Sequence, residues 1–382
     1  MPSERVSPAV AQVTTSAEQV AEILASEFLR LGYFSASTGP TGTAASHGLS
    51  AASANSTDKL DYDPLRSVSE EFTGLQVQSV GFEQGTEQPA VHLYLTRGSA
   101  RMMKSVPGEI LGVPLRTHKM GPVSVRPEMA AASTNRGHVY EHNGRICCGS
   151  SCAPTSENCA GTLGALVHRL IGDDYLYLLS NNHVLAGCNH VPHSQPILAP
   201  SNMDGRPDIR APEEVGRHQM ISPLASGDPD FVTPCEVDLA LARATNPSGI
   251  SSWQGDDLQG YDTPVIVKEP ESMMPVKKFG RTTNITFGEV ESRITARTPI
   301  PYTSKHFKGV VWFQNVWTVR SASNDPFALG GDSGSLVVTA DGSQAVGVLF
   351  AASQTGEYGW IVPMPAVVAA FGGLELVGGH GV

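Results

Sequence analysis

A serine within a glycine-rich turn is the arrangement in this sequence best suited to covalent chemistry. Ser333 lies in the stretch FALGGDSGS, which spans positions 327–335. Glycines beside a serine permit backbone conformations that a Cβ would forbid, and they let another molecule approach the main chain closely. The N–H groups of Gly331 and Ser333 are therefore candidate donors to the oxyanion that forms on a carbonyl during acyl transfer. The same residue types also make up ordinary surface turns.

A serine hydroxyl becomes a good nucleophile when an imidazole takes its proton and a carboxylate orients that imidazole. His183 follows an apolar run and a polar Ser-Asn-Asn sequence, and Asp238 lies inside the apolar run 236–242. A carboxylate there is costly to bury unless another group pairs with it. Each residue alone could be an ordinary core, loop or cap residue. Their joint order along the chain, His183, then Asp238, then Ser333, indicates a base, an orienting acid and a nucleophile.

Three stretches resemble the active-site motifs of the chymotrypsin-like serine proteases, in that family's order: SNNHVLA, VDLALA and GGDSGSLVV. The resemblance covers about positions 158–376. It is most specific to the narrow-leaf type of trypsin-like protease from plants and bacteria, through CAGTLGALV, FGRTTNITFGEV and VGVLFAAS. It implies a mainly β fold of two antiparallel six-stranded barrels, the first carrying His183 and Asp238 and the second Ser333. It also implies a serine endopeptidase that works through an acyl-enzyme, with the amides of Gly331 and Ser333 as the oxyanion hole and with no cofactor or metal.

Two other classes of function compete with this interpretation. A protease fold can serve as a catalytically silent scaffold for protein interactions, in which case the N-terminal part, positions 1–128, would be the functional one. An esterase-like α/β hydrolase is disfavoured, because its catalytic residues follow the order Ser, acid, His and its sheet is parallel. Labelling with a fluorophosphonate probe separates an enzyme from a scaffold.

The resemblance also places the pocket for the substrate side chain that precedes the scissile bond. Phe327, six positions before the nucleophile, is expected at its base with Ala328, while Ala351 and Ala352 form the opposite wall. A cation would find no counter-charge there and would carry a large desolvation penalty. Small or medium apolar side chains are therefore expected. If the loop is displaced by two positions, Asp325 could reach the pocket and reverse that preference.

Related digestive proteases mature by a cut that frees an Ile amine, which then pairs with the Asp beside the serine. Arg145-Ile146 lies at about the position of such a junction relative to His183. The sequence ICCG nevertheless departs from the IVGG of those enzymes. Activation by cleavage is therefore not expected.

Composition sets broad limits on the partners of the chain. At 382 residues the chain exceeds the usual length of one domain, and 40% hydrophobic residues fit a soluble, loop-rich β protein. The net charge of -11 argues against nucleic acid as a partner. No apolar stretch is long enough to span a membrane and no secretory signal is apparent, so the cytoplasm is the expected location. Protein or peptide substrates are the expected partners.

The pattern along the chain predicts several parts. A helix is predicted over 15–31 from a capping box of Thr15 and Glu18 and an apolar face that includes Val20. This helix either packs on its own chain or docks a regulatory protein or sister subunit. Alternating apolar residues predict the order strand, strand, helix, strand in the next unit. The predicted boundaries are an amphipathic helix at 1–34, a flexible linker at 35–65, a small α/β domain at 66–128, a cysteine-containing connector at 129–157 and the protease domain at 158–376.

Four of the six cysteines, Cys147, Cys148, Cys152 and Cys159, are clustered just ahead of the predicted first barrel. A zinc site is disfavoured, because adjacent cysteines cannot easily bind one tetrahedral ion together. Small buried thiols are expected instead. The protease resemblance places Cys159 near Cys188, and in a reducing cytoplasm this pair would stay unbridged.

Overall fold

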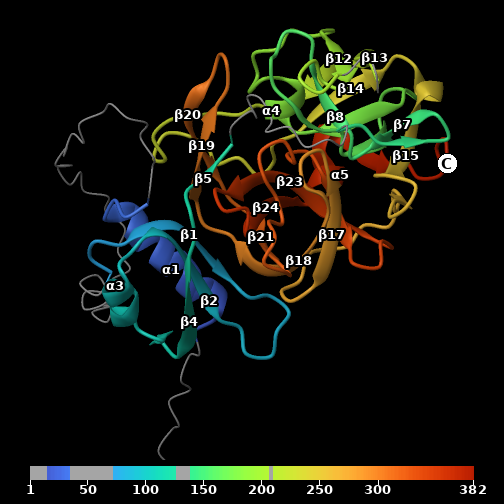
Figure 1. Cartoon of the computed structure of the whole chain (residues 1–382). Helices are drawn as coiled ribbons and strands as arrows, with labels where there is room; N and C mark the ends of the chain where they lie inside the picture. The colour runs from blue at the N-terminus through green and yellow to red at the C-terminus, as the bar shows by residue number, and fades with distance from the viewer. Residues whose placement is uncertain (1–14, 35–71, 126–137, 206–209) are drawn as a thin grey trace, which may run out of the picture.

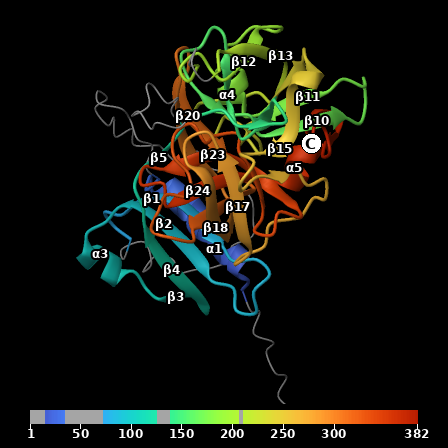
Figure 2. The same ribbon diagram turned by 45° about the vertical axis from the view of Figure 1, so that its right-hand side comes forward.

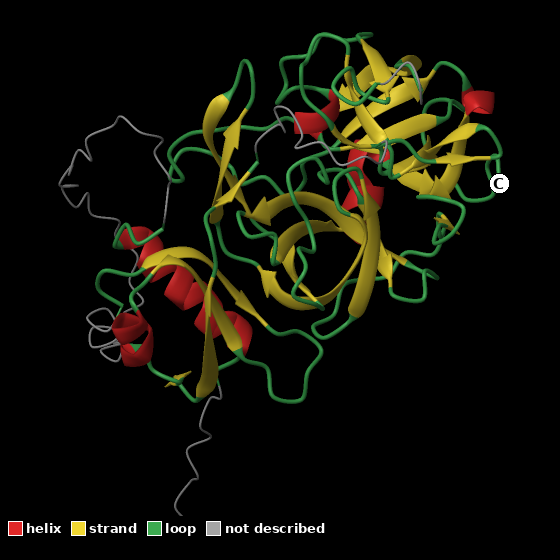
Figure 3. Cartoon of the chain, viewed as in Figure 1, coloured by secondary structure: helices red, strands yellow, loops and turns green. Residues whose placement is uncertain are grey.

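The structure, a computed structural model, describes residues 15–34, 72–125, 138–205 and 210–382. It is mainly β, with a small α/β unit at the N-terminal end and two β domains after it (Figure 1). Coloured by secondary structure, the two β domains consist almost wholly of strands and loops (Figure 3). Among the described residues, none of the helices combines the length and the apolar character needed to span a bilayer. The predicted linker at 35–65 lies outside the described residues.

The N-terminal unit has the predicted order of strand, strand, helix and strand. Its first two strands are antiparallel, and the parallel pairing of the second and the last requires a crossover, which the short helix provides. Turned by 45°, the molecule shows the long helix lying along these strands (Figure 2). The elements are α1 (Ala17–Arg30), β1 (Gln76–Phe82), β2 (Val91–Arg97), α3 (Ala100–Ser105), β3 (Glu109–Ile110) and β4 (Val113–Lys119).

Helix α1 is capped one position later than predicted. Ser16 Oγ accepts from Gln19 N, and Gln19 Oε1 accepts from Ser16 N, so this pair forms the capping box instead of Thr15 and Glu18. Ser-x-x-Gln supplies the same spacing and chemistry as the predicted pair. The apolar face of the helix, which includes Phe28, is buried against β1 and β2 of the same chain. This favours the first of the two roles considered for the helix, packing on its own chain.

The first β domain is an eight-stranded antiparallel sheet in the order β25-β10-β11-β14-β13-β12-β8-β9. It has eight strands where six were expected, with the C-terminal β25 at one edge and β8 and β9 at the other. Its strands are β8 (Ser151–Pro154), β9 (Gly161–Thr162), β10 (Ala165–Arg169), β11 (Tyr177–Ser180), β12 (Pro196–Ala199), β13 (Glu213–Ile221), β14 (Ala240–Ala244) and β25 (Leu374–Leu376), with helix α4 (Asn182–Leu185) after β11. A smaller sheet beside it contains β6 (Glu141–His142), β7 (Arg145–Cys148), β15 (Ile250–Gln254) and β16 (Tyr261–Asp262).

The second β domain contains a closed six-stranded antiparallel barrel in the order β17-β22-β23-β24-β21-β18. It closes because β17 pairs with both β22 and β18. Together the two domains confirm the double-barrel, chymotrypsin-like architecture expected from the sequence. The elements are β17 (Pro275–Gly280), β18 (Asn284–Ile294), β21 (Val316–Ser321), β22 (Leu336–Thr339), β23 (Ala345–Ser353), β24 (Tyr358–Pro363), the hairpin β19 (Thr298–Thr303) and β20 (Lys308–Phe313), the short strand β5 (Val123–Ser124) and helix α5 (Met364–Ala369).

The cysteines are free thiols throughout the described residues. Cys147 and Cys148 lie on β7 and Cys152 on β8, all fully buried. Burial raises the pKa of the Cys159 and Cys188 thiols to about 12, so both stay protonated at neutral pH. They therefore pack as small apolar groups.

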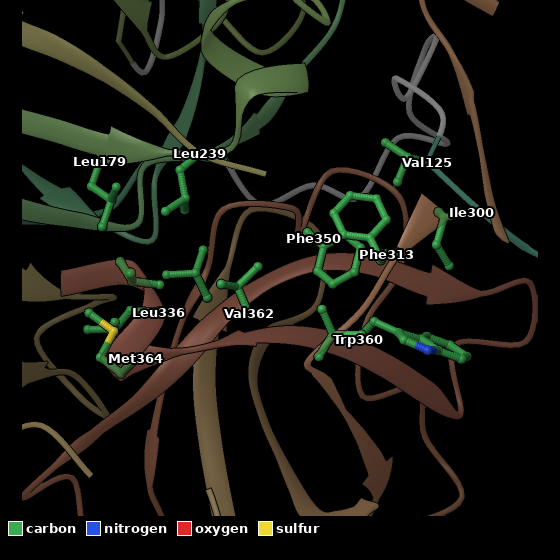
Figure 4. Close-up of a cluster of buried hydrophobic side chains, with 14 of the residues drawn as sticks. Val125, Leu179, Leu239, Ile300, Phe313, Leu336, Phe350, Trp360, Val362 and Met364 are labelled. Carbon is green, nitrogen blue, oxygen red and sulfur yellow. The ribbon is translucent and has the colours of Figure 1, made fainter. Parts of the chain in front are cut away.

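One apolar core joins the two β domains. Leu179 and Leu239 project from the first domain toward Leu336, Val362 and Met364 of the second (Figure 4). Fully burying one such side chain contributes about 1.5 to 3 kcal/mol. This shared core holds the end of β11 against the turn that precedes β22.

Candidate active site

Strand pairing in the first β domain brings His183 and Asp238 together. Strand β11 ends at Ser180, and Asn181 starts the short helix α4 that carries His183. Asp238 shortly precedes the neighbouring strand β14, in which Ala240 is the register partner of Ser180. Both side chains therefore leave the same edge of the sheet, although 55 residues separate them.

The Asp238 carboxylate is fully buried and accepts four hydrogen bonds. Oδ1 accepts from the amides of Asn182 at 2.8 Å and His183 at 3.3 Å, and Oδ2 accepts from His183 Nδ1 at 2.5 Å and Tyr302 Oη at 2.8 Å. A carboxylate facing Nδ1 fixes the proton on that nitrogen and leaves the lone pair on Nε2. The arrangement therefore holds His183 with its free nitrogen directed away from Asp238.

Tyr302 was not identified from the sequence. It lies on the β19–β20 hairpin, 64 residues after Asp238, and only the folded chain brings its hydroxyl to the carboxylate. Burial, reinforced by the charge of Asp238, raises the pKa of Tyr302 well above its usual value. The phenol therefore stays protonated and donates to the carboxylate.

The turn that carries Ser333 packs directly on the end of β11. Gly334 has φ +97°, and a Cβ on it would lie 2.1 Å from Ser180 Oγ, so only glycine fits. The Ser333 carbonyl accepts from the Thr162 amide at 2.8 Å. Because Ser180 ends the strand that leads into the helix of His183, these contacts bring Ser333 to the junction of the two β domains.

Ser333 Oγ donates to the Phe350 carbonyl at 3.3 Å, and among the described residues it has no hydrogen bond to His183. The structure thus joins His183 to Asp238 directly, while the serine hydroxyl points to β23. Hydrogen bonds between catalytic groups are often longer or poorly aligned before substrate binds. Within the same described part of the chain, the amides of Gly331 and Ser333 have no hydrogen-bond acceptor.

Asp332, beside the serine, faces a buried lysine. Its carboxylate accepts from the amides of Thr282 at 2.8 Å, Thr283 at 3.1 Å and Leu329 at 2.9 Å, and Lys278 Nζ lies 3.5 Å away. Both charged side chains are fully buried. Burial lowers the pKa of Lys278, and the attraction of Asp332 opposes this shift. The turn FGRTTNITFG therefore holds Asp332, the residue before Ser333, through the amides of Thr282 and Thr283.

A cavity of about 270 Å³ opens beside Ser333. Phe327 and Ala328 do not line it, because both are buried in the interior of the second barrel. This departs from the predicted pocket, in which Phe327 formed the base, whereas Ala351 and Ala352 do line the cavity. Asp325 is exposed and lies outside it. The lining residues are Pro122, Ser124, Val125, Leu329, Gly330, Ser333, Leu349, Ala351, Ala352, Ser353 and Gln354.

The residues that line the cavity indicate which type of side chain it can accept. None of the described residues that line it is ionisable, so a Lys or Arg side chain would lose its hydration without gaining a counter-charge. If Ser333 is the nucleophile of a peptidase, we expect cleavage of a peptide library after Ala, Val, Leu or Met, with discrimination of roughly 10- to 200-fold per misfit methylene. A profile dominated by Arg or Lys would contradict this pocket and leave the assignment of Ser333 untouched.

A short strand of the chain itself lies beside Ser333. Strand β5 pairs antiparallel with the end of β23, with Ser124 opposite Ala352 and Val123 opposite Ser353. On its other side, Val125 N donates to the Pro301 carbonyl at 2.8 Å. An extended segment of the chain thus already occupies the edge of β23 next to the cavity.

Comparisons with known proteins give likenesses of structure only. No family model matches the chain, and no curated protein matches it. Among solved structures, a glutamic acid-specific serine protease reported to use a histidine triad in substrate binding is similar at 18% identity and a TM-score of 0.41, over 61% of this chain and 100% of that one. Protease A of Thermobifida fusca is similar at 16% identity and a TM-score of 0.40, over 61% of this chain and 98% of that one. An alpha-lytic protease homolog is similar at 19% identity and a TM-score of 0.38, over 59% of this chain and 96% of that one. The chymotrypsin-like fold of the chain is evident from its own strand pairing.

Proposed function

We propose that the chain is a serine endopeptidase in which Ser333 is the nucleophile, His183 the general base and Asp238 the group that orients it. The observation that carries the proposal is the buried Asp238 carboxylate, which holds His183 by Nδ1 at 2.5 Å at the same junction where a glycine-lined turn presents Ser333. The unpaired amides of Gly331 and Ser333 and the adjacent cavity support it further.

In the proposed reaction, Ser333 Oγ turns from the Phe350 carbonyl toward His183 Nε2, which takes its proton as Oγ attacks the peptide carbonyl. The amides of Gly331 and Ser333 donate to the oxyanion. Protonated His183 then gives its proton to the leaving amine, and an acyl-enzyme remains. Water, deprotonated by His183, hydrolyses that ester and restores the serine. Asp238 stabilises the imidazolium in both halves of the reaction.

A fluorophosphonate probe tests the proposal directly. We expect covalent modification of the intact chain, located at Ser333 by peptide mass mapping and greatly reduced in His183→Ala. A scaffold without catalysis would remain unlabelled. Labelling at another serine would show that the nucleophile is wrongly assigned.

The buried ion pair of Lys278 and Asp332 bears on activation. The Asp332 carboxylate already has a cation and several amide donors, so a new amino terminus has no place to pair with it. Ile146, beside the candidate junction, is fully buried in β7 and pairs with Ile250. We expect active enzyme to have the intact mass of the uncut chain. Activity that appears only after cleavage at Arg145 would contradict this.

Strand β5 is expected to limit access to the proposed site, because it occupies the edge of β23 beside Ser333. Val123 of this strand is buried but does not line the cavity, so Val123→Ala loosens the strand without reshaping the pocket. A loss of about 1 kcal/mol of packing should raise kcat/KM for extended peptides about fivefold. Val77→Ala, an equally buried valine in the N-terminal unit, is the matched control. Unchanged or lower kcat/KM in a folded Val123→Ala variant would show that β5 does not limit access.

A further inference from the structure

Two histidines and a glutamate meet where the N-terminal unit contacts the second barrel. His92 lies on β2, His118 on β4 and Glu291 on β18. His92 Nδ1 is 2.9 Å from His118 Nε2 and 3.9 Å from Glu291 Oε2. One ligand atom from each residue lies within 4.8 Å of the other two. This is the one such group of three within the described residues, and none of its members belongs to the candidate active site.

The surroundings direct specific nitrogen atoms toward the centre of the cluster. His92 Nε2 lies 3.1 Å from Glu83 Oε1, so the carboxylate holds the proton on Nε2 and leaves the Nδ1 lone pair facing His118. His118 Nδ1 lies 3.2 Å from the Tyr358 hydroxyl, which leaves its Nε2 facing His92. A metal binds an imidazole through a ring nitrogen that carries no proton.

We propose that this cluster binds a divalent transition metal, zinc above all, through His92 Nδ1, His118 Nε2 and the Glu291 carboxylate. Two imidazole nitrogens and one carboxylate are a ligand set typical of zinc, with a fourth position open to water. Tetrahedral bonds of about 2.0 to 2.1 Å place ligand nitrogens roughly 3.3 Å apart, so the two rings need to separate by only a few tenths of an ångström. The Glu83 carboxylate behind His92 is the partner that metal-binding histidines usually have.

Two arginines compete with a cation at this position. Arg320 Nε lies 3.4 Å from Glu291 Oε1, and the Arg116 guanidinium pairs with Glu83. Both arginine side chains are about half exposed, at 48% and 56%, so their charged ends can move into solvent when an ion enters. Glu291 and His118 are 10% and 16% exposed, so both side chains reach the surface only slightly. Arg320 therefore weakens binding but does not block the ligand atoms.

A metal here would tie the N-terminal unit to the protease-like barrel, because two ligands come from one and the third from the other. Among the residues that the structure describes, the direct strand pairing between them is a single register pair, Phe82 with Arg293. Strand β4, which carries His118, also leads after a short connection to β5 beside Ser333. Occupancy of the site would thus hold the segment that borders the candidate active site. The sequence predicts no metal site here, and no local pattern in it joins three residues from strands this far apart.

Binding of zinc itself is the first test, and it does not depend on the proposed function. Tag-free full-length protein, treated with a chelator and dialysed, is titrated with ZnCl₂ by calorimetry, and its bound metal is measured by elemental mass spectrometry. We expect stoichiometric uptake and a higher melting temperature with zinc. His118→Ala and Glu291→Gln should lose both effects, while His193→Ala, which removes an exposed histidine outside the cluster, should keep them.

Two further variants separate a built site from adventitious binding. Glu83→Gln should weaken zinc binding roughly 10- to 100-fold, as loss of the carboxylate behind a ligating histidine does. Arg320→Gln removes the competing cation and should tighten binding, whereas a mere hydrogen-bonded cluster would gain no affinity for zinc. Uptake that is absent in the parent chain and in Arg320→Gln, or that persists unchanged in His118→Ala and Glu291→Gln, overturns the proposal. Zinc binding without peptide hydrolysis would support the site and contradict only the proposed protease activity.

Discussion

Replacing Ser333 by alanine is expected to abolish peptide hydrolysis and fluorophosphonate labelling while the protein stays folded. The side chain is small and partly exposed, and its hydrogen bond to the Phe350 carbonyl is long at 3.3 Å. Its loss should therefore cost little stability. Removal of a triad nucleophile typically lowers kcat by about 10⁴- to 10⁶-fold. Peptide turnover, circular dichroism and thermal unfolding of the same preparation measure both parts of this expectation.

The matched controls distinguish the nucleophile from other serines and from its partners. Ser343→Ala, in an exposed turn outside the site, should keep full activity. Asp238→Asn preserves the shape of the side chain but disturbs the His183 tautomer, and a loss of about 10⁴-fold in kcat is expected. Unchanged turnover in Ser333→Ala would exclude the proposed mechanism.

Replacing Lys278 by methionine is expected to destabilise the protein and to impair the oxyanion hole together. Met fills a similar volume but leaves the buried Asp332 carboxylate without its cation. Breaking one side of a buried ion pair costs about 3 to 5 kcal/mol. Because Asp332 also holds the Leu329 amide at 2.9 Å, the turn that presents Gly331 should loosen, and kcat should fall roughly 10²- to 10³-fold. Denaturant unfolding and steady-state kinetics measure the two effects.

Lys277→Met is the control for this substitution. Lys277 is the preceding residue, but its ammonium group lies 4.5 Å over the Tyr261 ring at the surface of the barrel, away from Asp332. Its replacement should change stability by less than about 1 kcal/mol and leave kcat unchanged. The double variant Lys278→Met, Asp332→Asn removes both charges and should recover much of the lost stability. Equal effects of the Lys277 and Lys278 substitutions would contradict a specific role for the ion pair.

The sequence alone determined the chemistry-bearing motifs and the type of fold. His183, Asp238 and Ser333 each lie in a contiguous motif, and alternation of apolar residues indicates strands because successive side chains point to opposite faces of a sheet. The order of strands and helix in the N-terminal unit could be predicted for the same reason. The capping box was displaced by one position, because Ser16 and Gln19 offer the same local spacing as Thr15 and Glu18.

Tertiary structure decided which side chains support these motifs. Lys278 meets Asp332, and Tyr302 meets Asp238, from strands that lie far apart in the sequence. No local sequence pattern predicts such pairs, because the hydrogen-bond partner of a buried polar group comes from the strand that the fold places beside it. The cavity beside Ser333 differs from the predicted pocket for a related reason. Phe327 has a large apolar side chain, which is fully buried inside the closed barrel. Leu329 lines the cavity instead.

The same reason applies to β5 and to the proposed metal cluster. The sequence around Val123 is that of an ordinary short strand, and only its pairing with Ala352 and Ser353 shows that it lies beside Ser333. His92 and Glu291 come from distant parts of the sequence and meet because β1 joins β18 at the edge of the barrel. Apolar periodicity specifies which face of a strand is buried, but contacts between distant strands are set by how the sheets pack, which the local sequence does not encode.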